Sequence, residues 1–392
     1  MAVKAESKFW ADNLAYGSAT ILSGILNWLY AILLAHGMGP ARYGVVVTLN
    51  NVVAVVTLPA SVVTLAATRR GKPCRKLLRI RIWYGAAGTL LWVVMAIFST
   101  FLSSAFKISP SLFLIFGLAT WPIIDYAANL GYLARARQYL WLGILTVAGS
   151  ALSVGAVLGA VQWPEPVAAL GLLQALALWI LWATSARAVK RVPVESAPNP
   201  QSIALSAGVG IAQSVMTLMD GVVAKARLRP VQAGYYNGLA TVGQSLPFAA
   251  ASLALVMLTA MLDRPQQRTK WLHWTLAIYL GLGFGIEGLF WRMPKTIVDW
   301  ALGGRFNTVS HWLVLYGLGM LALGLLMIYL AEAIARGWWE LLMLVIGGLA
   351  LWMLLLIHAH GFPGLVHATA LSLILVSFAV LATRTWLNWH NG

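Results

Sequence analysis

Apolar residues recur along this chain in runs of about 20 residues, separated by short polar or basic segments. A helix of that length crosses the roughly 30 Å hydrocarbon core of a bilayer. The pattern therefore predicts an all-α integral membrane protein with about twelve transmembrane helices. The predicted spans are 10–36, 42–67, 82–104, 111–133, 139–162, 166–187, 201–224, 233–261, 271–291, 309–335, 338–358 and 364–386.

The composition argues against a soluble fold. Of the 392 residues, 60% are apolar and 10% are charged, whereas a soluble domain carries about 25% charged residues. The net charge of +16 does not predict a nucleic-acid partner, because the basic residues form short clusters between the apolar runs. Lys and Arg are distributed in this way in cytoplasmic loops. With the N-terminus inside, most of the 27 Lys and Arg residues fall in inner segments, which predicts that both termini are cytoplasmic.

A proline-containing polar stretch from Arg187 to Ser202 divides the spans into six plus six. Its small polar residues and basic start are typical of a linker. We therefore expect an N-terminal lobe over 1–190, a cytoplasmic linker over 191–200 and a C-terminal lobe over 201–392.

The two halves share a sequence pattern. "LLAHGMGPARYGVVVTL" begins at Leu33 and "VAKARLRPVQAGYYNGL" begins at Val223. Both have a proline between two helices (Pro40, Pro230), a glycine four residues later beside a tyrosine, and Leu-Pro in the following helix, at Pro59 and Pro247. This correspondence indicates an internal repeat, which is common in secondary transporters.

Five segments resemble the polysaccharide and O-antigen (Wzx-like) flippases of the multidrug/oligosaccharidyl-lipid/polysaccharide (MOP) exporter superfamily. They are "GMGPARYGVVVTL", "NLGYLARARQYLWLGIL", "MDGVVAKARLRPVQAGYYNGLATVGQSLP", "ALGGRFNTVSHWLVLYGLG" and "HGFPGLVHATALSLILVS", and they occur in the family's order over almost the whole chain. The resemblance implies two pseudo-symmetric six-helix lobes around a central cavity. It also implies that the protein transfers an undecaprenyl-linked oligosaccharide across a bacterial cytoplasmic membrane by alternating access. The lipid carrier of this oligosaccharide is a polyprenyl phosphate or pyrophosphate.

One departure from the family concerns charge. Members often carry several Arg or Lys residues within their spans, whereas no predicted span here has one near its middle. This departure weakens the expectation of a strongly anionic glycan.

A carboxylate inside the membrane is costly and is a functional candidate for that reason. Asp125, about midway along the fourth predicted span, is the ion-coupling candidate. The alternative interpretation is a helix-packing residue bonded to a neighbouring Tyr, Trp or Asn. Amides suit sugar hydroxyls because they donate and accept hydrogen bonds, although they also hold helices together. The predicted substrate and cavity residues are therefore Asn27, Asn50, Asn51, Asp125, Asn129, Gln213, Asn237 and Gln244.

Charged residues near the span ends have two interpretations each. Asp220, Lys225, Arg227 and Arg229 could form an outer gate that attracts phosphate or acidic sugar, but a local ion pair that fixes the turn is favoured. Glu287 is expected to pair with Arg292 or to lie at the interface rather than to couple an ion.

Glu332 and Arg336, spaced i and i+4 at a helix end, are expected to form a surface ion pair.

Catalysis finds little support, because the chain has 11 carboxylates, one cysteine and no phosphate-cradling glycine loop. We expect no cofactor, and partners limited to the lipid bilayer, the lipid-linked oligosaccharide and a polymerase or glycosyltransferases. The alternatives are a multidrug extruder, a lipid II flippase, or a non-transporting subunit of a polysaccharide-synthesis complex.

Overall fold

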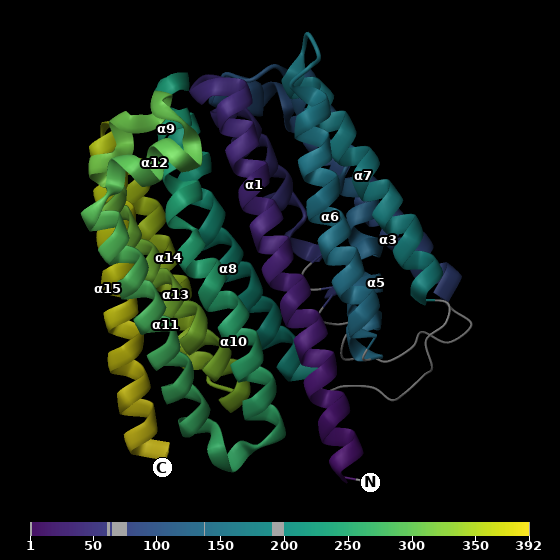
Figure 1. The fold of residues 1–392 in the computed structure, drawn as a ribbon, viewed down its shortest axis with the longest axis vertical. Helices are drawn as coiled ribbons and strands as arrows, with labels where there is room; N and C mark the ends of the chain where they lie inside the picture. The colour runs from purple at the N-terminus through teal and green to yellow at the C-terminus, as the bar shows by residue number, and fades with distance from the viewer. Residues whose placement is uncertain (1, 61–62, 65–76, 137, 190–199, 392) are drawn as a thin grey trace. The chain divides into compact units, whose positions relative to one another are not determined.

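A computed structural model describes residues 2–60, 63–64, 77–136, 138–189 and 200–391 (Figure 1). In this part of the chain every regular element is helical, and eleven stretches are long and apolar enough to cross a membrane. The first stretch, Ser18–Val56, covers most of the first two predicted spans, because α1 (Ala2–Val56) is two helices joined at Gly39. Gly39 has a φ of 69°, which glycine adopts without steric cost. The all-α membrane architecture with about twelve spans is confirmed.

The chain divides into two compact units, Met1–Ile203 and Ala204–Gly392. The expected linker over 191–200 lies outside the described residues, apart from Pro200, at which α8 (Pro200–Arg227) begins.

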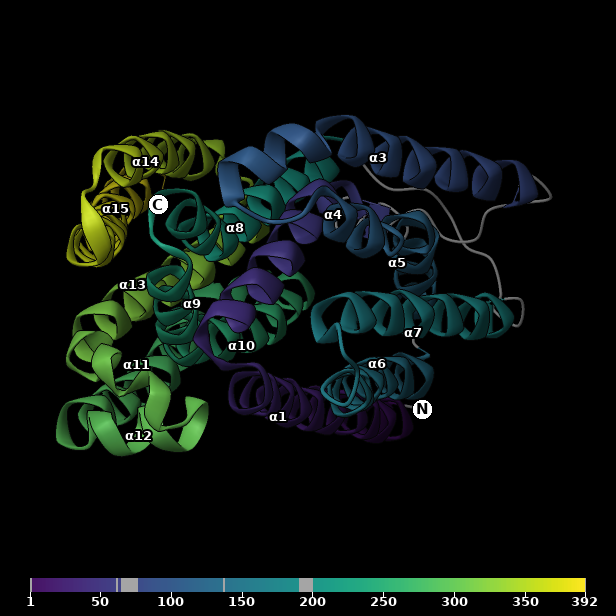
Figure 2. The same cartoon turned by 90° about the horizontal axis from the view of Figure 1, so that it is seen from above.

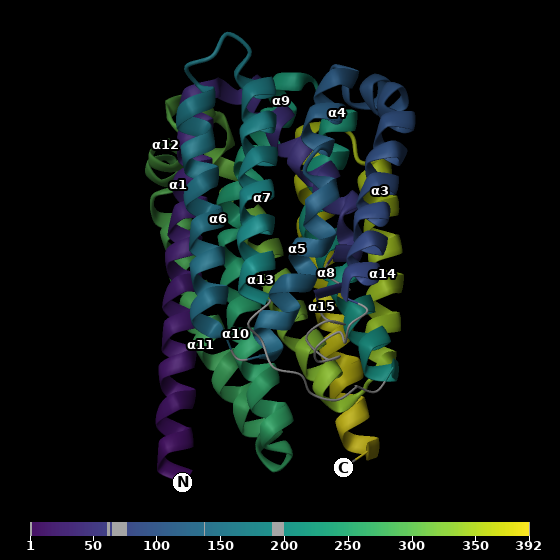
Figure 3. The ribbon, with the colours of Figure 1, turned by 90° about the vertical axis from the view of Figure 1, so that its right-hand side faces the viewer.

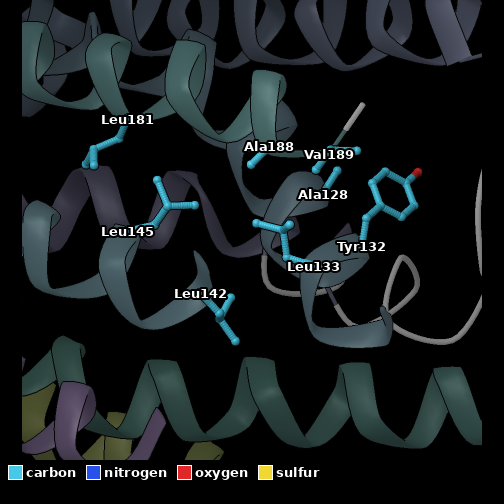
Figure 4. Packing of buried hydrophobic residues seen from close by; sticks show 8 residues of the cluster. All are labelled: Ala128, Tyr132, Leu133, Leu142, Leu145, Leu181, Ala188 and Val189. Atoms are coloured by element: carbon cyan, nitrogen blue, oxygen red, sulfur yellow. The ribbon is translucent and has the colours of Figure 1, made fainter. Parts of the chain in front are cut away.

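The first unit contains α1, α3 (Leu77–Phe106), α4 (Pro110–Gly117), α5 (Thr120–Arg135), α6 (Tyr139–Ala160) and α7 (Pro166–Val189). α1, α6 and α7 run side by side, and α5 packs against α3 and α7 (Figures 1 and 3). A buried core that includes Leu133, Leu145 and Leu181 lies between α5, α6 and α7 (Figure 4). This core fixes the three helices that carry much of the candidate site.

The second unit contains α8, α9 (Pro230–Gly243), α10 (Ser245–Asp263), α11 (Arg268–Arg292), α12 (Pro294–Leu302), α13 (Leu313–Arg336), α14 (Trp339–His358) and α15 (Gly361–Asn391). Two 3₁₀ segments, η1 (Pro265–Gln267) and η2 (Gly304–Trp312), connect them. α13 lies between α11 and α15 (Figure 2). α13 belongs to the candidate membrane span Gly304–Arg336. In the most apolar 18-residue part of this span 78% of the residues are buried, which is the largest share among the eleven candidate spans of the described residues. A helix that is apolar all round is expected at such a central place.

Prolines set many helix boundaries. Because proline lacks an N–H group and has a fixed φ, it suits the first helical position. Helical segments begin at Pro110, Pro166, Pro200, Pro230, Pro265 and Pro294.

Three predicted spans are interrupted just before a proline. The second is broken at Thr57, before Pro59, and the fourth is divided into α4 and α5 before Pro122. The eighth is divided into α9 and α10 at Gln244, before Pro247. Proline inside a helix removes a hydrogen bond and crowds the preceding turn. The breaks before Pro59 and Pro247 fall at matching places of the predicted repeat.

The segment 292–308, which contains α12 and the first part of η2, lies between the ninth and tenth predicted spans. Its pieces are too short to give a membrane-span signal in the sequence, and so their helical structure was missed.

Candidate functional site

The first unit contains a cavity of about 410 Å³. Its polar lining residues come from α1, α5, α6 and α7. The full lining consists of Ser23, Asn27, Ala119, Tyr126, Leu130, Leu145, Thr146, Gly149, Ser150, Ser153, Gln174, Ala177, Leu178 and Leu181. Asn27 lines this cavity of the first unit together with hydroxyl and amide groups that were not predicted, and its place in a central cavity stays a prediction.

Helical spacing brings the polar groups of α1 to one face. Ser23, Asn27 and Tyr30 follow one another at intervals of four and three residues, which places them above one another. The Ser23 hydroxyl lies 2.6 Å from the Ser150 hydroxyl of α6, so the two form a hydrogen bond. This bond ties α1 to α6 at the cavity.

Tyr30 connects three helical segments. Its hydroxyl accepts hydrogen bonds from Asn50 Nδ2 at 3.1 Å and from Gln174 Nε2 at 2.9 Å. Asn50 lies beyond the kink of α1, whereas Gln174 is on α7 and lines the cavity. The predicted residue Asn50 thus supports the cavity through Tyr30, and Asn51 beside it is half-buried.

The cavity lining has hydroxyl and amide groups but no Asp, Glu, Lys, Arg or His side chain. Such a lining can exchange hydrogen bonds with a neutral polar molecule in both directions. It offers no fixed charge to a strongly cationic or anionic ligand.

Asp125 lies outside this lining and is 6% exposed. The indole N–H of Trp182 donates a hydrogen bond to its Oδ2 at 2.6 Å. Trp121 and Trp179 are stacked with their ring centroids 4.5 Å apart, and Trp182 stands edge-on to both. This contact is the one that the helix-packing interpretation of Asp125 expects, and its ion-coupling role stays a prediction.

Asn129 lies one turn after Asp125 on α5 and is fully buried. Its Nδ2 donates to the Ser185 hydroxyl of α7 at 3.0 Å. Together with the Trp182 contact, this bond forms a polar seam between α5 and α7.

In the second unit, Asp220 on α8 is 1% exposed and accepts several hydrogen bonds. Tyr316 of α13 donates to its Oδ2 at 2.5 Å, and Tyr236 of α9 donates to the same atom at 3.4 Å. The backbone N–H of Gly221 donates to Oδ1 at 2.7 Å. Tyr236 also shares a hydrogen bond of 2.9 Å with Thr369 of α15, so the network joins four helices.

The basic residues predicted to form a gate with Asp220 are divided between buried and exposed places. Lys225 is 2% exposed, whereas Arg227 and Arg229 are exposed. Arg227 donates to the backbone carbonyl of Ile357 at the end of α14. Their gating role stays a prediction.

The predicted amides of the second unit lie within the helix packing. Gln244 Nε2 donates to the carbonyl of Thr217 at 2.7 Å, and Gln213 Nε2 donates to that of Met327 at 3.5 Å. Asn237 is fully buried. Within the described residues of the second unit, two of these three amides therefore donate to backbone carbonyls.

Sequence reasoning missed several partners in these networks, above all Tyr30, Gln174 and Tyr316. A signal was present for Tyr30, which lies three residues after Asn27 on the same helix face. The positions of Gln174 and Tyr316 depend on which helices become neighbours, and the sequence contains no local sign of that.

No protein-family model and no curated protein sequence matches the chain. Solved structures do match it. "Lipid II flippase MurJ, inward closed conformation" has a TM-score of 0.74 at 12% identity over 95% of this chain and 87% of that one.

An inward-facing multidrug-resistance MATE family transporter of the MOP superfamily has a TM-score of 0.67 at 12% identity over 96% and 98% of the two chains. A MOP-superfamily transporter from Pyrococcus furiosus has a TM-score of 0.62 at 12% identity over 96% and 95%. The chain therefore has the fold of MOP-superfamily transporters. The narrower resemblance to polysaccharide and O-antigen flippases stays a prediction.

Proposed function

We propose that this chain is a flippase that carries a polyprenyl-linked oligosaccharide from the inner to the outer leaflet of a bacterial cytoplasmic membrane by alternating access. The transporter fold in a multi-pass membrane protein supports the transport part of the proposal. The substrate class rests on one observation, which is the uncharged hydroxyl and amide lining of the first-unit cavity.

A sugar headgroup needs hydrogen-bond partners when it leaves water. Each buried polar group without a partner costs about 2–7 kcal/mol, and the hydrocarbon core supplies none. Ser, Thr, Tyr, Asn and Gln side chains can replace water because they both donate and accept. The cavity volume of about 410 Å³ falls within the roughly 300–1,000 Å³ of small-molecule sites. It can therefore receive part of a glycan.

The same lining disfavours two other substrate classes. Amphipathic drug cations are bound by aromatic faces and carboxylates, but the lining has one aromatic residue, Tyr126, and no carboxylate. A strongly anionic headgroup calls for Lys or Arg, and the lining contains neither. A weakly charged glycan fits best.

The carrier phosphate requires a different partner. We expect it to meet the exposed Arg227 and Arg229 around the turn between α8 and α9, since guanidinium groups bind phosphate in a bidentate manner.

The proposal can be tested in liposomes that contain purified protein and a fluorescent lipid-linked oligosaccharide. Exposure of the glycan in each leaflet is scored with a membrane-impermeant reagent under imposed ion gradients. We expect protein-dependent transfer, with slower transfer by Asn27→Leu and Gln174→Leu. Loss of one hydrogen bond of about 1 kcal/mol corresponds to a roughly fivefold effect.

Thr184→Val is the matched control for Gln174→Leu. Thr184 is also on α7, but its hydroxyl donates to the Ile180 carbonyl of its own helix and lies outside the cavity. Absence of transfer under every gradient contradicts the flippase proposal and favours a non-transporting subunit. Transfer of drug cations or lipid II in preference to the oligosaccharide favours the corresponding alternative.

A further inference from the structure

Glu287 of α11 has an environment that differs from the expected one. Its side chain is 6% exposed, and Gly317 of α13 lies directly against it. A Cβ atom at Gly317 would overlap Glu287 Oε1 and would lie 2.9 Å from Cδ and 3.0 Å from Phe290 Cδ2. The absence of a side chain at position 317 therefore makes the space that the carboxyl group occupies.

This contact continues a regular packing pattern between α11 and α13. Tyr279 fits against Gly324, and Leu321 fits against Gly283. Tyr279, Gly283 and Glu287 are spaced by four residues and so share one face of α11. Glu287 is thus part of the helix interface.

Neither carboxyl oxygen of Glu287 has a hydrogen-bond partner among the described residues. Arg292 is exposed and does not bond either oxygen, so the expected pair with Arg292 is wrong, whereas a place at the membrane interface stays a prediction. An ionised carboxylate without a donor or a cation is strongly destabilised in an apolar interior. The uncharged acid also lacks hydrogen-bond partners here, but its penalty is much smaller because no charge is removed from water.

The titratable groups around α11 do not change this conclusion. α11 packs against α10, η1, α12 and α13. On α11, Tyr279 interacts electrostatically with Glu287, but its hydroxyl donates to the Leu321 carbonyl. The facing positions of α13 are Gly317 and Leu321, and α10 contributes Leu246 at Gly283.

Other charged side chains of these elements point elsewhere or lie far along the helices. Lys295 and Asp299 of α12 are exposed, and η1 contains no titratable residue. Glu332 and Arg336 of α13 lie about four and five turns from Gly317, respectively, and contact each other. Tyr316 is bonded to Asp220, and Asp263 is the last residue of α10.

We propose that Glu287 is a proton-binding site of the second unit, occupied while α11 and α13 are packed together. Because the packed interface supplies no partner for the charged form, release of this proton requires the carboxylate to leave the contact with Gly317. Proton exchange at Glu287 is then linked to separation of the two helices.

Infrared spectroscopy of the full chain in bilayers tests the proposal without any transport assay. The glutamates are labelled with ¹³C at the side-chain carboxyl, so that their signals are distinguished from those of Asp125 and Asp220. The chain has five other glutamates. Among those whose side chains the structure describes, Glu165 and Glu340 are exposed, and Glu332 is ion-paired. At neutral pH we expect a labelled neutral-acid carbonyl band that disappears in Glu287→Gln.

Glu340→Gln and Glu165→Gln are the controls and should keep the band. No labelled acid band in the unsubstituted protein, or a band that survives in Glu287→Gln, overturns the proposal. Should Glu287→Gln not fold, Glu287→Met provides the same comparison with an apolar side chain.

A role of this proton in driving transport rests on the proposed function. In that case Glu287→Gln should flip the lipid-linked oligosaccharide at a rate that no longer depends on an imposed pH gradient. If the acid band is present but the protein does not flip the oligosaccharide, the proton site stands and the flippase proposal fails. If the protein flips the oligosaccharide but shows no acid band, the flippase proposal stands and the proton site fails.

Discussion

The indole N–H of Trp182 lies 2.6 Å from the Asp125 carboxylate and binds α7 to α5 inside the first unit. One turn further along, Asn129 and Ser185 connect the same two helices. The position of Asp125 in this seam is compatible with a packing role alone or with packing and ion coupling together. The two possibilities predict different behaviour of one variant.

Asp125→Asn keeps an oxygen that accepts from Trp182 but removes the negative charge. If Asp125 couples an ion, gradient-driven flipping should slow while expression and stability stay near their usual levels. Flipping rates in liposomes with and without the gradient measure this effect. An unchanged gradient-driven rate removes Asp125 from the coupling mechanism and leaves the packing role.

Trp182→Phe tests the packing role by itself. It removes the donor and leaves the buried carboxylate with one hydrogen bond fewer, which we expect to destabilise the protein by about 1–3 kcal/mol. Thermal unfolding in detergent provides the measurement. Thr184→Val on the same helix should change the unfolding temperature little, because its hydroxyl bonds only within α7.

The two tyrosines at Asp220 should differ in their energetic coupling to it. Tyr316 donates at 2.5 Å, a length typical of a charge-assisted O–H···O bond, whereas Tyr236 donates at 3.4 Å. Double-mutant cycles with Asp220→Asn and each Tyr→Phe isolate the pairwise terms. We expect more than about 1 kcal/mol for Tyr316 and less for Tyr236. The opposite order contradicts this geometry.

Gly319 should not tolerate alanine. A Cβ atom there would lie 2.7 Å from the Ala370 Cα of α15, and main-chain atoms cannot move aside as a flexible side chain can. We expect Gly319→Ala to lower the free energy of unfolding by about 1–3 kcal/mol. Gly347→Ala on α14 is the control, since nothing lies within 4 Å of its Cβ. It should be neutral or stabilising by up to about 1 kcal/mol.

The two arginines at Glu332 should contribute unequally. Arg384 of α15 donates to Glu332 Oε2 at 2.6 Å and to Oε1 at 3.4 Å. Arg336 Nε lies 2.8 Å from Oε1, but its geometry does not make a hydrogen bond. Arg384→Gln should therefore destabilise by about 1–3 kcal/mol, and Arg336→Gln by less. Equal losses in thermal unfolding of the two variants argue against this assignment.

The membrane spans could be predicted because hydrocarbon requires continuous helices of a fixed length. The breaks before Pro59 and Pro247 were also visible as sequence features. The contacts between segments that are distant in the sequence could not be predicted. The expected ion pair between Glu332 and Arg336 is present, at 2.8 Å. Its surface location was wrong, because Glu332 is fully buried, and its second partner Arg384, 52 residues away, was not predicted.

Glu287 illustrates a different error. Residues five apart on a helix point about 140° away from each other, so Glu287 and Arg292 do not share a face. The helical periodicity was therefore enough to reject the pairing of Glu287 with Arg292. That Gly317 would lie opposite Glu287 did not follow from any local sequence pattern. The first-unit cavity was not predicted as such: Asn27 was chosen for a central cavity, and the residues that line the observed cavity with it depend on how the helices are rotated.

The interrupted spans have a mechanical consequence. At two of the breaks a threonine hydroxyl covers a nearby carbonyl: Thr57 donates to Val53 O, and Thr120 donates to Gly117 O, both at 2.8 Å. Because lipid tails offer no hydrogen-bond partner, a hydroxyl at a break lowers the cost of interrupting the helix at that point. We expect the fourth predicted span, which is divided into α4 and α5, to bend there more easily than a continuous helix of the same length.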